Sequence, residues 1–151
     1  MSLKIGDSIP DLELKDQNGK IFNFSSLNGV QPFVVYFYPR DFTPGCTKQA
    51  CSFRDQYEEF RELGAEVIGI SSDSEDSHAR FVKKYDLPFI ILSDEDQKAR
   101  ELFGVKPNLL GMVPGRETFI FDLQGMLKYR FNSMNAKRHI PEALTALENI
   151  K

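Results

Sequence analysis

Continuous apolar runs recur along the chain, and their length and composition are typical of β-strands. The first run, residues 33–38 (FVVYFY), contains only aliphatic and aromatic side chains, as a strand covered on both faces does. Two shorter runs, at 67–70 and 89–92, have the same character. The pattern therefore predicts three buried strands.

Two predicted hairpins lie outside these strands. A run at 12–14 that alternates leucine with a polar residue precedes a second run at 21–24, and Asn18-Gly19 between them is a strong signal for a tight turn. Residues 118–131 show a similar arrangement of two runs around a glycine-containing turn. Each hairpin is expected to add antiparallel strands to the sheet.

Helical spacing of apolar residues occupies the segments between the strands. The expected helices are residues 44–63, 74–85, 95–103 and a last helix that begins near Pro141. Gly104 is a typical C-terminal cap, and a proline such as Pro141 suits the first turn of a helix. Strands that alternate with helices indicate an α/β fold.

Length and composition narrow the class of protein. The 151 residues are one domain's worth of sequence without a linker or repeat, so we expect a single domain over residues 1–151. Hydrophobic residues make up 41% and charged residues 27%, which excludes a disordered chain and a membrane bundle. The formal net charge of −3 gives no electrostatic reason to expect nucleic acid or an anionic membrane as a partner.

Cysteine usage bears on the compartment. Two cysteines, Cys46 and Cys51, are too few for the disulfide framework of a secreted protein. The N-terminus has neither the apolar core of a signal peptide nor an Arg- and Ser-rich transit sequence. These features favour a reducing, cytoplasmic location, although a plastid protein that has lost its transit peptide would show them too.

The segment from Tyr38 to Asp55 carries the candidate chemistry. A buried strand ends at Tyr38, and Thr43-Pro44 is typical of a helix N-cap followed by a first-turn proline. Cys46 is then expected in the first turn of the helix, where free backbone N–H groups and the helix dipole favour an anion. Helix N-termini are a recurrent place for thiolates.

The helix dipole is too weak to ionise such a thiol by itself. A thiol with an ordinary pKa of ~8.5 is only a few per cent ionised at neutral pH. Moving that pKa to about 6 requires ~3.4 kcal/mol, whereas a helix terminus supplies ~0.3–1 kcal/mol. We therefore expect a cation beside Cys46. Arg40 is the candidate close in sequence, and Arg116 is the distant one.

Helical geometry separates the two cysteines. Cys46 begins an apolar stripe that faces the core, and its further members are Ala50, Phe53, Tyr57 and Phe60. Cys51 lies about 140° around the helix, on its polar border. Their Cα atoms would be about 8–9 Å apart, and a disulfide needs ~4.4–6.8 Å. A bond between them therefore requires the start of the helix to unwind.

These features suit the two-electron reduction of a peroxide. A thiolate attacks a peroxide oxygen and becomes a sulfenic acid, which a second thiol condenses with before further oxidation. The Thr43 hydroxyl, the Cys46 amide and a guanidinium are candidate donors to the leaving oxyanion.

The spacing Pro39-x-x-x-Thr43-x-x-Cys46 resembles the active-site signature of the peroxiredoxins, and Cys51 makes the chain similar to their bacterioferritin comigratory protein, or peroxiredoxin Q, subfamily of atypical two-cysteine enzymes. The resemblance extends over most of the chain. Its further blocks are residues 5–10, 70–73, 92–94 and 115–122.

The resemblance implies a thioredoxin-like fold, with a central mixed sheet flanked by helices and an added N-terminal β-hairpin. It implies reduction of hydrogen peroxide and organic hydroperoxides, with Cys46 as the peroxidatic and Cys51 as the resolving thiol. Thr43 and Arg116 would bind the peroxide and stabilise the thiolate. It further implies turnover by thioredoxin or a similar dithiol, no cofactor, and a monomer. The residues expected around the substrate are Pro39, Phe42, Pro44 and Gly45.

One segment departs from many bacterial members. The chain has no tryptophan, and residues 105–115 look closer to plant and cyanobacterial peroxiredoxin Q. The outer rim of the pocket, and with it the substrate preference, is therefore not defined by the resemblance.

Three other functions use similar residues. A thioredoxin-type oxidoreductase would place its cysteines about three residues apart. A glutathione peroxidase would need a tryptophan. A redox sensor that uses the Cys46–Cys51 disulfide without rapid turnover stays open. We expect His78 to be a packed structural residue and His139 to be exposed, and the cysteine and histidine spacing predicts no metal site.

Overall fold

The computed structural model describes residues 3–107 and 115–150. Its strands form one seven-stranded sheet in the order β2-β1-β5-β4-β3-β6-β7. The strands are β1 (Glu13–Asp16), β2 (Ile21–Asn23), β3 (Phe33–Phe37), β4 (Glu66–Ser71), β5 (Ile90–Ser93), β6 (Glu117–Phe121) and β7 (Leu127–Asn132).

The centre of the sheet consists of the three buried apolar runs. β3 pairs with β4 and β4 with β5 in parallel, and all five residues of β3 are buried. On the other side of β3, β6 and β7 add antiparallel strands. The three predicted buried strands and the second hairpin are confirmed.

The predicted N-terminal hairpin extends the opposite edge of the sheet. β1 and β2 pair in antiparallel fashion, and β1 also pairs with β5. Gly19 in the connecting turn has a φ of +79°, a conformation that glycine adopts without steric cost. The mixed α/β sheet with an added hairpin is therefore as expected.

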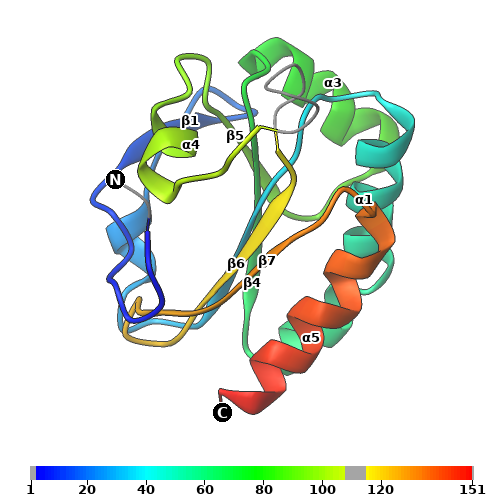
Figure 1. Ribbon diagram of the computed structural model, residues 1–151. Helices are drawn as coiled ribbons and strands as arrows, with labels where there is room; N and C mark the ends of the chain where they lie inside the picture. Colours follow the sequence, from blue (N-terminus) through cyan, green and yellow to red (C-terminus); the bar gives the residue numbers. More distant parts are fainter. Residues whose placement is uncertain (1–2, 108–114, 151) are drawn as a thin grey trace.

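Helices cover both faces of the sheet (Figure 1). α1, α2, α3 and α5 lie on one face, and α4 and the 3-10 helix η1 pack with the N-terminal segment on the other. The bounds are η1 (Phe24–Leu27), α1 (Pro44–Asp55), α2 (Tyr57–Glu62), α3 (Glu75–Tyr85), α4 (Lys98–Phe103), the 3-10 helix η2 (Ala136–Arg138) and α5 (His139–Asn149).

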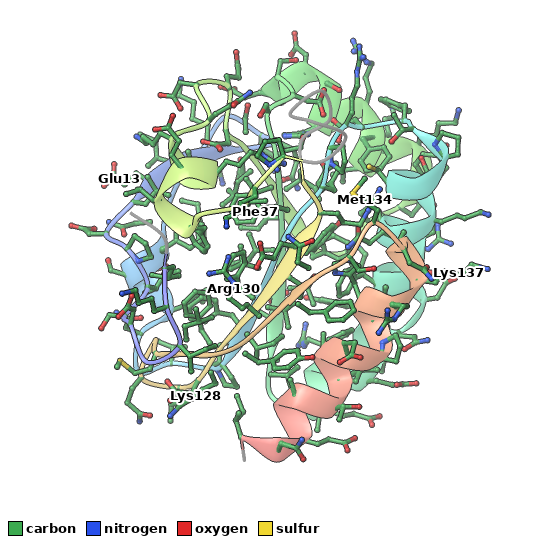
Figure 2. The ribbon with its side chains drawn as sticks, viewed as in Figure 1. Glu13, Phe37, Lys128, Arg130, Met134 and Lys137 are labelled. Carbon is green, nitrogen blue, oxygen red and sulfur yellow. The ribbon has the colours of Figure 1, made fainter. Side chains whose placement is uncertain are left out.

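Alternation along β3 divides the core into two layers. Val34 and Tyr36 pack under α1 and α5, whereas Phe33, Val35 and Phe37 face the α4 side. Figure 2 shows Phe37 on the side that α4 covers. No helix of the described residues is long and apolar enough to span a membrane.

Two helices differ from their predicted bounds. The expected helix over 44–63 is interrupted at Gln56, so that α1 and α2 are separate, although the apolar stripe continues to the buried Phe60. α4 begins three residues later than predicted. The carboxylate of Asp94 accepts hydrogen bonds from the N–H groups of Ala99 and Arg100, and this cap holds the preceding residues in a turn.

Candidate active site

Cys46 is the third residue of α1, as predicted, and only 1% of it is exposed. The helix begins at Pro44, and Thr43 occupies the N-cap position with extended backbone angles. Thr43 therefore has the predicted N-cap position, but its hydroxyl makes no capping hydrogen bond to the helix. It donates to the carbonyl oxygen of Arg40 at 2.8 Å and thereby closes the preceding turn.

A buried guanidinium lies against the Cys46 sulfur. Nη2 of Arg116 is 3.4 Å from Cys46 Sγ, and 4% of Arg116 is exposed. The distant candidate is thus the cation beside the thiol, whereas the side chain of Arg40 is exposed. The guanidinium is thus placed to donate a hydrogen bond to the sulfur.

Gln49 is a site residue that the sequence reasoning missed. It lies one helical turn after Cys46, is fully buried, and accepts a hydrogen bond from Nη1 of Arg116 through Oε1. The guanidinium is therefore held between the sulfur and an amide from the same helix. The spacing of three residues from Cys46 was the available signal, because it places a polar side chain on the buried face.

Two nitrogen atoms of this cluster carry N–H groups that have no acceptor among the described residues. Nε2 of Gln49 and Nε of Arg116 are buried without a hydrogen-bond partner among the described residues. Buried donors without partners are costly, and a bound oxygen atom would satisfy them. The cluster is therefore suited to a small oxygen-rich ligand.

Gly45 leaves room for the close approach of the arginine. A Cβ atom on Gly45 would lie 3.1 Å from Nη2 of Arg116, which is tighter than ordinary contact. Of the residues predicted around the substrate, Gly45 thus borders the guanidinium, Pro39 is half-buried, and Pro44 is exposed.

A second buried arginine, Arg100, supports this region and was not predicted. Its guanidinium donates to the carbonyl oxygens of Gly115 at 2.8 Å and Tyr38 at 3.0 Å. Burial lowers the pKa of Arg100. These two bonds fix the residue before Arg116 to the end of β3, where the active-site loop begins.

Tyr36 lies under the site as a neutral phenol. Burial, together with the nearby Cys46 and Asp41, raises the pKa of Tyr36 well above its usual range. Its ring stacks on Phe53 of α1 with 4.5 Å between centroids. The floor below the sulfur is therefore aromatic and uncharged.

The expectation that His139 is exposed is wrong. The residue is fully buried, and its ring contacts the Thr118 hydroxyl at 2.7 Å and the Ser133 carbonyl at 2.7 Å. Burial, with a smaller effect of Arg116, lowers the pKa of His139 to about 4. These partners fit a neutral ring that accepts at Nδ1 and donates from Nε2. The start of α5 is covered because β7 returns beside β6, which a local pattern does not reveal.

The loop between β3 and α1 has an unusual conformation at Phe42. The φ of Phe42 is +65°, in the left-handed region that bulky residues avoid, and 42% of the residue is exposed. A cleft of about 410 Å³ opens beside this loop. Phe42 and Thr43 line it together with Arg40, Asp41, Asp73, Ser77 and Arg80.

His78 is packed and fully buried, as expected, but it belongs to a polar cluster. Its Nδ1 and carboxylate oxygens of Asp41 and Asp73 lie within 4.8 Å of one another, close enough to hold a metal ion. Each of the three groups already has hydrogen-bond partners in the protein. The absence of a metal site stays a prediction.

Cys51 is half-buried, and both thiols are free. Because α1 runs without interruption from Pro44 to Asp55, the two cysteines keep helical spacing, and the sulfurs cannot bond in this conformation. Residues 108–114, most of the segment expected to form the pocket rim, lie outside the described residues.

Comparison with known families gives a consistent result. Residues 5–130 match the AhpC/TSA family. The chloroplastic peroxiredoxin Q of Sedum lineare is 50% identical over 147 residues, which cover 97% of this chain and 78% of that protein. The chloroplastic peroxiredoxin Q of Arabidopsis thaliana is 49% identical over 144 residues, which cover 95% of this chain and 66% of that protein.

Solved structures show the same similarity. Peroxidoxin BcpB from Mycobacterium tuberculosis aligns with a TM-score of 0.90 and 38% identity, over 99% of each chain. A peroxiredoxin Q from Xanthomonas campestris aligns with a TM-score of 0.87 and 30% identity, over 97% of this chain and 96% of the other. The expected thioredoxin-like fold is thereby confirmed.

The expected cytoplasmic location is contradicted by these relatives, which are named as chloroplastic proteins. The small number of cysteines, on which the expectation rested, does not distinguish the cytoplasm from a plastid.

Proposed function

We propose a two-cysteine catalytic cycle for this chain, which belongs to the AhpC/TSA family and, within it, to the peroxiredoxin Q group of peroxidases. The substrates are hydrogen peroxide and organic hydroperoxides, the reductant is thioredoxin or a similar dithiol protein, and the chain acts as a monomer. The names of the relatives support a plastid as its compartment.

The first step is attack by Cys46. Its thiolate displaces the leaving oxygen from the peroxide, so that an S–O bond forms, the O–O bond breaks and the product is a sulfenic acid. The leaving hydroxide or alkoxide takes a proton and departs as water or an alcohol. Arg116 faces the charge that develops on the oxygens, and Thr43, at the N-cap, is the proposed hydroxyl contact to the peroxide.

The second step is resolution by Cys51. Its thiolate attacks the sulfur of the sulfenic acid, forming an S–S bond and releasing hydroxide, which a proton converts to water. The first turns of α1 unwind to allow this bond. A reduced dithiol then exchanges with the disulfide and regenerates both thiols.

One observation carries the proposal. The guanidinium of Arg116 is 3.4 Å from the sulfur of a buried cysteine at a helix N-terminus. An inert buried cysteine needs no cation, and placing one there costs desolvation free energy.

A peroxidase assay coupled to thioredoxin and its reductase tests the proposal. We expect turnover with hydrogen peroxide and with a bulky hydroperoxide. Cys46→Ser should abolish it, because no thiolate remains. Cys51→Ser should consume one equivalent of peroxide and then stop. Stoichiometric, slow oxidation of the wild type without turnover would contradict the proposal and favour the redox-sensor alternative.

A further inference from the structure

The cluster around Asp41 lies outside the chemistry described so far, although Asp41 is only five residues before Cys46 and 5% exposed. Its Oδ1 accepts from the Tyr38 hydroxyl at 2.5 Å. Its Oδ2 accepts from the Ser77 hydroxyl at 2.8 Å and lies 2.7 Å from Nδ1 of His78. One loop carboxylate is thus bound to the end of β3 and to α3.

The backbone of the loop is held in the same place. The N–H group of Asp41 donates to Oδ2 of Asp73 at 2.8 Å. That oxygen also accepts from the hydroxyl of Ser71, the last residue of β4, at 2.7 Å. The loop before α1 is therefore fixed to three different elements by both backbone and side chain.

The pairing between Asp41 and His78 is balanced in charge. Nε2 of His78 lies 3.1 Å from the carbonyl oxygen of Leu92, which can only accept, so Nε2 carries a proton. The contact between Nδ1 and Oδ2 holds one further proton, on either atom. The pair is neutral in both arrangements, and this neutrality permits its complete burial.

The loop needs this support because of Phe42. A bulky residue at a φ of +65° is strained and persists only where the surrounding structure holds it. Asp41 is its immediate neighbour, and the Phe42 ring packs edge-on against Phe81 of α3 with 5.2 Å between centroids. This turn sets where Thr43 lies, and hence where α1 begins.

We propose that Asp41 and His78 are positioning residues for Cys46. The pair holds the turn from which α1 starts, so that the helix N-terminus and the sulfur stay beside Arg116 in the reduced protein. Loss of the pair shifts the population toward a form in which the first turn of α1 is unwound and the sulfur is exposed. This inference rests on the proposed function for its catalytic meaning.

Two rates that respond in opposite directions test the inference. In a Cys51→Ser background, Cys46 is the single thiol, and its single-turnover reaction with hydrogen peroxide and its alkylation by a bulky maleimide are measured. Asp41→Ala should slow the peroxide reaction about tenfold or more, as displaced catalytic groups do. It should accelerate alkylation several-fold, because an unwound helix exposes the sulfur. A variant that is less stable but still folded should not combine a slower peroxide reaction with faster alkylation.

Matched variants separate positioning from general stability. In Asp41→Asn the side chain still accepts from Tyr38 and can donate to Nδ1 of His78, so both rates should stay within about threefold of the parent. Asp16→Ala removes a buried carboxylate that holds the turn of the N-terminal hairpin through two backbone N–H groups, and it should leave both rates unchanged. Tyr38→Phe removes one hydrogen bond from Asp41 with little change in shape, and it should shift both rates in the expected directions by about threefold.

The following results would overturn the inference that Asp41 and His78 position Cys46. Unchanged rates in Asp41→Ala, or equal effects of Asp16→Ala, would overturn the inference. If Asp41→Ala does not fold, unchanged rates in Tyr38→Phe overturn it instead. Failure of the parent to react with peroxide would refute the proposed function, while the alkylation rates would still test whether the pair holds the start of α1.

Discussion

At the scale of single residues, the guanidinium of Arg116 makes two contacts at once, to the sulfur of Cys46 and to the amide of Gln49. A lysine ammonium carries the same charge but has no planar fork that could reach both. The charge and the geometry of this residue can therefore be tested separately.

We predict that Arg116→Lys slows the single-turnover reaction with peroxide by at least about tenfold, since removing one preorganised donor typically costs ~10²–10³ in rate. Stopped-flow measurement of peroxide consumption checks this. Arg138→Lys is the control, because Arg138 forms an exposed ion pair with Glu142. Equal rates for Arg116→Lys and the wild type would show that the positive charge alone suffices.

His139 gives a prediction for pH. Its pKa is lowered from 6.5 to about 4 by burial, so the unfolded chain binds this proton more readily than the folded protein. Folding stability is therefore lost as the pH falls from about 6.5 to 4, by about 2 kcal/mol at pH 5. His139→Gln removes this loss.

Urea unfolding at pH 7 and pH 5 checks the effect. The stability difference between the wild type and His139→Gln should shrink by about 2 kcal/mol at the lower pH. Lys137 is an exposed residue of η2, two positions before His139. Lys137→Gln should therefore not change the pH dependence of folding stability. A constant difference at both pH values would refute the assignment.

At the scale of elements, the break at Gln56 separates α1, which unwinds in the proposed cycle, from α2, which does not have to unwind. α1 contains both cysteines. α2 is held independently, because Phe60 is buried and the Tyr57 hydroxyl donates to Glu66 of β4 at 2.7 Å. Rearrangement of the first helix therefore does not have to propagate into the second.

We predict that oxidation to the disulfide removes amide protection from residues 44–51 and leaves α2 and α5 protected. Hydrogen exchange followed by mass spectrometry on the reduced and oxidised forms measures this directly. The same protection of α1 in both forms would mean that the two sulfurs are not joined, because helical spacing keeps them too far apart.

At the scale of the whole molecule, local patterns predicted the fold well, whereas contacts between distant residues were harder to predict. The apolar run at 33–38 and the Asn18-Gly19 turn carry their information within a few residues. The contact of Arg116 with Cys46 arises because Phe37 pairs with Glu117 across β3 and β6. The need for a cation beside Cys46 made Arg116 one of two candidates, and the resemblance to a family favoured it over Arg40.

Other contacts were missed for the same reason. Arg100 binds the backbone at Gly115, and His78 binds Asp41, but neither pair is close in sequence or part of a periodic pattern. The prediction that His139 is exposed is wrong because its local sequence shows only the helix that it begins, whereas its burial depends on strands that cover it. Packing between elements decides these positions, and sequence periodicity describes one element at a time.

The two partners at the sulfur belong to parts of the molecule that behave differently. Arg116 directly precedes β6, a strand that is paired on both sides, whereas Cys46 lies in the helix that unwinds in the proposed cycle. In the proposed cycle, peroxide converts the thiolate to a sulfenic acid and Cys51 then converts this to a disulfide, so that the buried positive charge is left without its counterion. We therefore expect the buried guanidinium to be destabilised in that oxidised form, and reduction to relieve this when the regenerated thiolate returns beside it. Closure of the catalytic cycle would then be driven by the charge that also promotes its first step.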